Sequence, residues 1–232
     1  MKRLLPIIVL ILAVAIIVGV GVKREKATEE NSATSSSSQS TSTSPSTNQS
    51  VSDGTITVTF DNSVFGLATN RDQVLIKSYI PPCDESFDYC LYLNSNTYKG
   101  TNFESAGLRI QKRTDLSTEN VCLGTPPTGY DATRQPDSLN SKDSYSTSIF
   151  SNMSDAAAGH YSNGSLYRLF IRRDSSCYEF ETRVGQTQFA NYPEGSIKKF
   201  TDADLNNVQS KLFGILNSVT LVTGETKLFS AN

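Results

Sequence analysis

The residues of this chain that could do chemistry are few. His160 is the one histidine, and Asp155 and Ser162 lie close to it in sequence. A serine nucleophile needs a base and a group that orients it, but closeness along a strand does not make a triad, and a lone histidine beside aromatic residues is more typical of a packed or surface position. The chain has no Gly-x-Ser-x-Gly, Ser-x-x-Lys, P-loop or dinucleotide motif. We therefore assign no catalytic residue and no cofactor.

A carboxylate pair is the second candidate. Glu179 and Glu181 lie two apart on a predicted strand, so their side chains start roughly 7 Å apart on one face, a separation found in some glycosidases. The alternative is a solvated strand face on which Arg168, opposite Glu181, neutralises one carboxylate. We expect the second interpretation and keep a hydrolase as an alternative.

Four cysteines give the clearest structural signal: Cys83, Cys90, Cys122 and Cys177. Without Cys-x-x-Cys, and with one histidine, a metal site is not expected. Two disulfides are the economical interpretation. Of the three connectivities we favour Cys83–Cys90, which closes a short loop, and Cys122–Cys177, which ties distant strands. In the chain-entropy model these bonds contribute about 2.5 and about 4 kcal/mol.

The charge balance argues against nucleic acid as a partner, because 21 Lys and Arg face 23 Asp and Glu, with a net charge of −2. Two basic groups remain alternative sites for anionic envelope polymers, although such charges usually form a solvated sheet face. They are the cluster Arg109, Lys112 and Arg113, and the pair Arg172 and Arg173.

An uncharged apolar run, residues 4–22, precedes all of these. As a helix it would be about 28 Å long, close to the roughly 30 Å hydrocarbon thickness of a bilayer. We predict an uncleaved transmembrane helix after a cytoplasmic end at 1–3; a cleaved signal peptide, whose apolar region is usually shorter, is the alternative. The positive charges on the two sides are nearly equal, so they do not orient it.

The stretch 23–53 is rich in Ser and Thr and has almost no large apolar residue, so we predict a disordered linker. Residues 54–232 hold all 11 Phe and 10 Tyr and are predicted to fold as one domain. The Ser/Thr linker and the cysteines are typical of the outer side of a membrane. We therefore predict a single-pass protein of the cell membrane whose domain lies outside the cytoplasm.

Alternation of polar and apolar residues predicts strands over 55–60, 74–79, 87–93, 106–112, 145–153, 156–162, 165–173 and 176–184. Asn163-Gly164 predicts a hairpin turn, which would place His160 opposite Tyr167.

A two-residue loop at Asp174-Ser175 would define a second hairpin. It would pair Ile171 with Tyr178, Leu169 with Phe180 and Arg168 with Glu181. Such a hairpin has one apolar and one charged face.

One helix is predicted over 201–217, with Thr201 as N-cap, Asp204 three residues later and an apolar stripe at 205, 208, 212, 215 and 216. A short strand, 219–222, follows it. The predicted fold class is α+β: a mostly antiparallel sheet with the C-terminal helix packed on one face, preceded by one N-terminal transmembrane helix. The Pro- and Gly-rich stretch 124–143 is expected to be disordered, with a ligand-covering lid or a missed small element as alternatives.

The C-terminal part also carries a resemblance. Cys177-Tyr-Glu-Phe180, then 191–195 (NYPEG), 198–200 (KKF), the predicted helix and the closing strand are similar to the ending of bacterial membrane-anchored extracytoplasmic proteins of unknown function. The late helix on a hairpin-rich sheet resembles the PsbP-like α/β/α sandwich over about residues 165–222. The resemblance implies a fold and brings no functional residues.

Together these patterns predict a non-enzymatic binding or envelope-associated module. Its expected partners are the membrane, through the N-terminal helix, and another protein or a cell-envelope polymer. The alternatives are an extracytoplasmic hydrolase that uses carboxylates or Ser and His160, and an accessory subunit of a membrane complex.

Overall fold

The structure, a computed structural model, describes residues 47–69, 86–94 and 96–229. The transmembrane helix predicted at 4–22, the strand predicted at 74–79 and Cys83 all lie outside these residues. Within the described ranges, no helix is long and apolar enough to cross a membrane.

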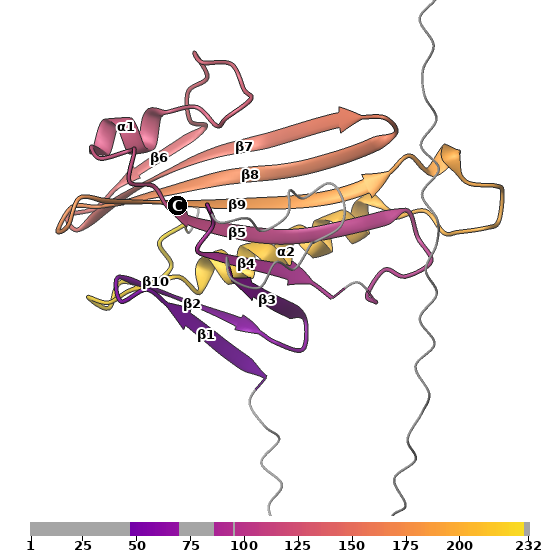
Figure 1. Cartoon of the computed structure of the whole chain (residues 1–232), viewed down its shortest axis with the longest axis horizontal. Coiled ribbons are helices and arrows are strands. Elements are labelled where there is room, and N and C mark those ends of the chain that lie inside the picture. The colour runs from indigo at the N-terminus through magenta and orange to yellow at the C-terminus, as the bar shows by residue number, and fades with distance from the viewer. Residues whose placement is uncertain (1–46, 70–85, 95, 230–232) are drawn as a thin grey trace, which may run out of the picture. The chain divides into compact units, whose positions relative to one another are not determined.

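The described chain forms two antiparallel sheets (Figure 1). The larger has seven strands in the order β3-β4-β5-β9-β8-β7-β6, and the smaller has three in the order β1-β2-β10. The strands are β1 (Asn48–Ser52), β2 (Ile56–Asp61), β3 (Phe65–Thr69), β4 (Tyr89–Leu93), β5 (Phe103–Lys112), β6 (Ser138–Ser141), β7 (Tyr145–Ala157), β8 (His160–Ile171), β9 (Ser176–Thr187) and β10 (Thr220–Leu221). The helices are α1 (Glu119–Gly124), the 3-10 turn η1 (Phe189–Asn191) and α2 (Asp202–Asn217). β1 lies inside the stretch predicted as linker, so folded structure starts before residue 54.

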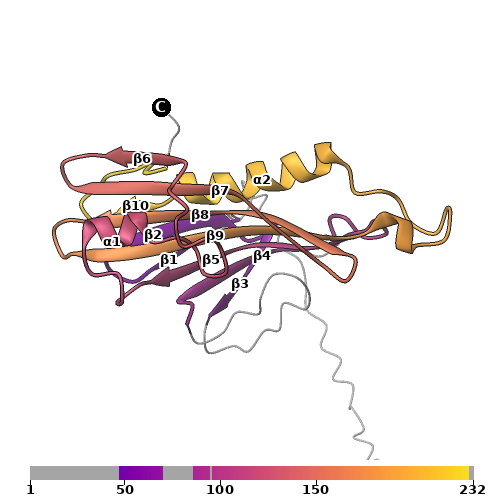
Figure 2. The ribbon, with the colours of Figure 1, turned by 90° about the horizontal axis from the view of Figure 1, so that it is seen from above.

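The two sheets share one hydrophobic core. Ile56, Val58 and Phe60 alternate inward from β2 and meet the apolar face of the large sheet, which includes Leu108 and Phe180. α2 joins the same core and lies along the long strands (Figure 2).

The predicted fold class, α+β with the C-terminal helix packed on one face of a mostly antiparallel sheet, is therefore wrong. The described residues are mostly antiparallel strand in a β-sandwich-like arrangement, in which the second sheet shares the core face. Alternation in β2 fits either sheet equally well. β2 belongs to the smaller sheet because Thr57 pairs with Thr220 of β10. These residues are far apart in the sequence, so no local pattern predicts the pairing.

The start of α2 is as predicted. The Thr201 hydroxyl accepts the Asp204 backbone N–H at 3.2 Å, and the Asp204 carboxylate accepts the Thr201 backbone N–H at 2.9 Å. This reciprocal capping box satisfies two N–H groups that the helix leaves unpaired. The buried side chains of the helix are Val208, Leu212, Ile215 and Leu216, four of the five predicted for the stripe.

The hairpin turn predicted at Asn163-Gly164 is wrong. β7 and β8 turn instead at Ala158 and Gly159, which have φ values of 50° and 82°. Gly164 lies in the middle of β8, where a Cβ atom would sit 2.1 Å from the carbonyl oxygen of Thr182 on β9. This glycine allows two backbones to approach closely rather than to turn.

The register of the next hairpin differs from the prediction by two residues. Ile171 pairs with Ser176, and Arg168 lies opposite Glu179 rather than Glu181. The connection is thus longer than two residues. Because side chains alternate with period two, a shift of two keeps each on its predicted face.

The stretch 124–143 was expected to be disordered. It contains β6, which pairs with β7 at the edge of the large sheet. The structure therefore contains the missed small element, one of the two alternatives.

Candidate functional site

A charged cavity of about 520 Å³ lies over the face of the large sheet that points away from the shared core. Charged residues of the central strands alternate toward it, and apolar residues of neighbouring segments complete its walls. Its lining comprises Ser86, Phe87, Arg109, Gln111, Arg113, Asp115, Pro127, Thr128, Met153, Leu166, Glu179, Glu181 and Arg183.

Glu181 lies between two arginines. It accepts hydrogen bonds from Arg109 Nη2 and from Arg183 Nε, the latter at 2.7 Å. Burial lowers the pKa of Arg183, but the hydrogen bond and charge of Glu181 outweigh it, so the pKa lies above its ordinary value. The guanidinium group of Arg183 therefore stays charged.

Arg109 has donors beyond the one that Glu181 accepts. Its side chain is almost fully buried, and its guanidinium carbon lies 4.2 Å from the ring centroid of Phe87, a cation–π contact. Its Nε is buried and has no hydrogen-bond partner among the described residues. A buried donor without an acceptor costs free energy.

Glu179 is the second carboxylate held by two arginines. It accepts from Arg168 Nε at 2.9 Å and from Arg113 Nη1 at 2.7 Å. Arg113 also binds Asp115 with two parallel hydrogen bonds of 2.8 and 2.7 Å. This hydrogen bonding lowers the pKa of Asp115 to about 2. The carboxylates thus hold the arginines in fixed orientations.

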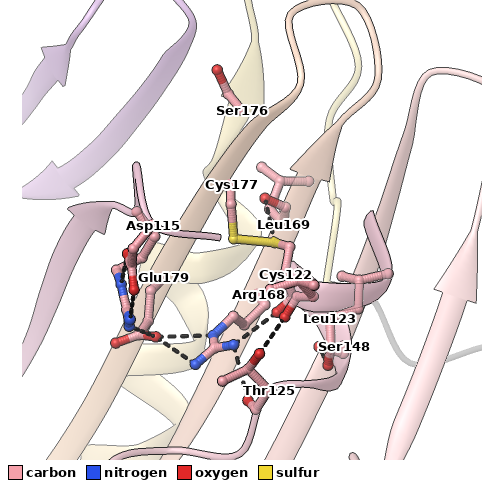
Figure 3. The surroundings of a disulfide bond; sticks show 12 residues. Asp115, Cys122, Leu123, Thr125, Ser148, Arg168, Leu169, Ser176, Cys177 and Glu179 are labelled. Carbon is pink, nitrogen blue, oxygen red and sulfur yellow. Dashed lines mark hydrogen bonds and ion pairs between the residues drawn. A yellow bond between two sulfur atoms is a disulfide. The ribbon is translucent and has the colours of Figure 1, made fainter. Parts of the chain in front are cut away.

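Arg168 joins this charged layer to α1 (Figure 3). Its side chain is 1% exposed, and its Nη1 donates to the carbonyl oxygens of Cys122 and Thr125 at 2.7 and 2.9 Å. Burial lowers its pKa, while Glu179 opposes that shift. The guanidinium group thus satisfies two carbonyls at the end of α1 that would otherwise lack donors.

A disulfide fixes α1 at the same place. Cys122 on α1 bonds to Cys177 on β9, as predicted, with 5.8 Å between their Cα atoms. The segment that follows α1 supplies Pro127 and Thr128 to the cavity wall. Cys90 is also disulfide-bonded, but its predicted partner, Cys83, is outside the described residues, so that pairing stays a prediction.

His160 and Ser162, triad candidates together with Asp155, contact other groups. His160 Nδ1 lies 2.7 Å from Glu104 Oε1. Ser162 is buried and lies opposite Asp155, and Arg183 Nη1 donates to its hydroxyl at 3.4 Å. The hydroxyl thus faces a cation rather than a base.

The predicted basic cluster is divided between the two faces of the sheet. Arg109 and Arg113 line the cavity, whereas the Lys112 ammonium lies 5.4 Å from the Tyr178 ring centroid, on the core side. Arg172 pairs with Glu119 of α1 at 2.7 Å.

Sequence reasoning missed Phe87, Asp115 and Arg183. The period-two run Glu179, Glu181 and Arg183 was the one available signal for the last of these.

Comparisons with known proteins give no assignment. No family model matches the chain, and no curated protein matches it.

Within the part of the chain that the structure describes, no group of three or more His, Cys, Asp or Glu residues could hold a metal ion.

Proposed function

We propose that this chain is a non-enzymatic binding module whose charged cavity binds a small ligand through a negatively charged group. The observation that carries the proposal is the set of arginines that line the cavity and are held in fixed orientations by carboxylates. The charge of the site supports it: three arginines and three carboxylates line the cavity, and the buried Arg168, paired with Glu179, adds a fourth positive charge. The lining residues are Arg109, Arg113 and Arg183, against Asp115, Glu179 and Glu181.

The size and the apolar lining narrow the ligand class. Ligand pockets commonly have volumes of about 300–1,000 Å³ and combine apolar walls with a few fixed polar groups. Phe87, Met153 and Leu166 supply the apolar part of this one. A carboxylate or phosphate attached to an aromatic or aliphatic body fits this combination.

The hydrolase alternative is less well supported. Glu179 and Glu181 each accept hydrogen bonds from two arginines. A glycosidase needs one carboxylic acid that delivers a proton and a second carboxylate that faces the sugar or a water molecule. Carboxylates that orient arginines are better suited to binding than to proton transfer.

We further propose that residues 4–22 anchor the module in a membrane and that the domain lies outside the cytoplasm. The apolar run, the Ser/Thr linker and the disulfide-bonded cysteines support this placement. An accessory subunit of a membrane complex is compatible with the same features.

The test is calorimetric titration of the full chain, in a nonionic detergent, with inorganic phosphate, benzoate and phenyl phosphate. We expect phenyl phosphate to bind more tightly than phosphate, and more weakly as salt is added. Gln111→Glu places a negative charge in the wall and should weaken binding about tenfold. Gln188→Glu, at an exposed position outside the cavity, should change little.

Three results would overturn the proposal. These are no binding of any probe, equal affinities for both variants and the parent, or release of phenol from phenyl phosphate, which would identify an enzyme.

A further inference from the structure

A second cavity lies on the opposite face of the large sheet and differs from the first in its chemistry. It has a volume of about 370 Å³ and lies between α2 and strands β7, β8 and β9. None of its lining residues is charged. Its polar lining is made of amides and hydroxyls, and two aromatic side chains, Tyr167 and Phe213, complete it.

Several polar groups of this cleft are available to a ligand. The side chains of Asn152, Asn163, Gln209 and Ser210 line it and make no hydrogen bond to any described residue. An amide offers both donors and acceptors, and a hydroxyl offers one donor and two acceptor sites. The lining can therefore bind a partner that also carries closely spaced donors and acceptors.

The β7 backbone forms a bulge at Asn152, which lines the cleft. The pairing of β7 with β8 shifts by one residue between Phe150 and Met153, and Asn152 within this bulge has a φ of 54°. Bulges occur next to binding sites, where they redirect a side chain, and asparagine adopts the left-handed conformation more readily than most residues. The extra residue leaves Phe150 and Met153 packed together with Leu166 while Asn152 lines the cleft.

The aromatic residues add the second half of the recognition chemistry. Tyr167 and Phe213 are half-buried, pack against the shared core on one side, and have ring centroids 6.5 Å apart. Aromatic rings offer flat apolar surface, which suits the C–H faces of a sugar ring. Sugars combine such faces with rows of hydroxyl groups that donate and accept.

We infer that this cleft binds a neutral carbohydrate, such as a short segment of a polysaccharide. An anionic ligand would lack a cationic partner here, and a metal ion would lack carboxylates. The site is independent of the charged cavity, which lies on the other face of the sheet.

The test uses the full chain in a detergent without a sugar headgroup, because a glycosidic detergent would compete. Saturation-transfer NMR and calorimetry would measure binding of three neutral probes: maltotriose, cellotriose and chitotriose. We expect at least one to bind with millimolar or tighter affinity. The double variant Asn152→Gly with Gln209→Ala should weaken that binding at least about tenfold.

Two matched controls keep the result interpretable. The test variant itself should fold, because glycine adopts the positive φ of Asn152 without strain. The first control, Asn206→Ala, removes an exposed amide of α2 that does not line the cleft. The second control is Gln111→Glu in the charged cavity. Neither control should affect sugar binding. If no trisaccharide binds at millimolar concentration, or if the double variant binds like the parent, the inference is wrong.

Discussion

Replacing Arg168 with lysine should destabilise the domain far more than its conservative chemistry suggests. Arg168 donates from Nε to Glu179 and from Nη1 to the carbonyls of Cys122 and Thr125, and its Nη2 forms an ion pair with Glu179 at 2.8 Å. A lysine ammonium is a compact point charge and cannot reproduce this planar fork. At least two buried hydrogen bonds that involve a charged group are lost, at about 1.5–3 kcal/mol each.

We therefore expect a loss of about 4 kcal/mol in unfolding free energy, which corresponds to about 8–16 °C in Tm for a domain of this size. Circular dichroism during thermal and urea unfolding of the oxidised protein would measure it. Arg173→Lys is the matched control, because Arg173 is exposed in the adjacent turn.

The disulfide gives a second, sharper measurement. Because Arg168 and the Cys122–Cys177 bond both fix α1 to the sheet, their losses should not add, with a coupling of about 0.5–3 kcal/mol in a double-mutant cycle. A cost of Arg168→Lys below about 1 kcal/mol, or full additivity with the double cysteine-to-alanine variant, would refute this account of how α1 is held.

Three further predictions concern the fold, each measured by urea unfolding. Gly164→Ala should cost about 1–3 kcal/mol or more, because its Cβ meets a backbone carbonyl of β9; Gly214→Ala, in open space on α2, should instead stabilise by about 0.5–1 kcal/mol. The pKa of Asp115 is lowered to about 2, so the stability that its ion pair contributes is present above about pH 4 and lost as the pH falls toward 2. Asp115→Asn should lower the unfolding free energy near neutral pH by less than about 1 kcal/mol, since the side chain is mostly exposed. An equal loss at about pH 2 would contradict this prediction. The pKa of Tyr178 is raised by burial and by its hydrogen bond to Asp53, so the stability that this hydroxyl contributes is present below about pH 10 and lost as the pH rises further. Tyr178→Phe should lose less unfolding free energy at alkaline pH than the parent. Parallel pH profiles of the two proteins would count against this prediction.

The features that could be predicted from the sequence depend on local or periodic signals. The capping box of α2 needs only residues three apart, Thr201 and Asp204. The two faces of the β8–β9 hairpin follow from alternation, which an error of two in register leaves intact. The sequence therefore places Arg168, Glu179 and Glu181 on the correct face, although it pairs Arg168 with Glu181 rather than Glu179.

The features that could not be predicted depend on contacts between distant segments. Asn163-Gly164 is the stronger hairpin signal, yet Gly164 is required by the close approach of β9, and the turn forms at Ala158-Gly159 instead. β1 and β6 are short and polar, so they lack the alternation that marks a strand. The charged cavity needs segments before β4, after α1 and along β9 to converge, which no local pattern encodes.

The sequence pattern predicts that the charged face of the sheet is solvated. In the structure α1 covers part of this face, and the covering has a physical explanation. α1 has six residues and buries only Cys122 and Leu123, which contribute about 3–5 kcal/mol. Ordering six residues costs about 6–12 kcal/mol of backbone entropy, so the helix cannot hold this position by its own packing. The Cys122–Cys177 bond, at about 4 kcal/mol, the two carbonyl hydrogen bonds from Arg168 and the Arg172–Glu119 ion pair supply the difference. It follows that the wall formed by Pro127 and Thr128 depends on the oxidised disulfide, and that a reducing environment would loosen the charged cavity before it affected the shared core.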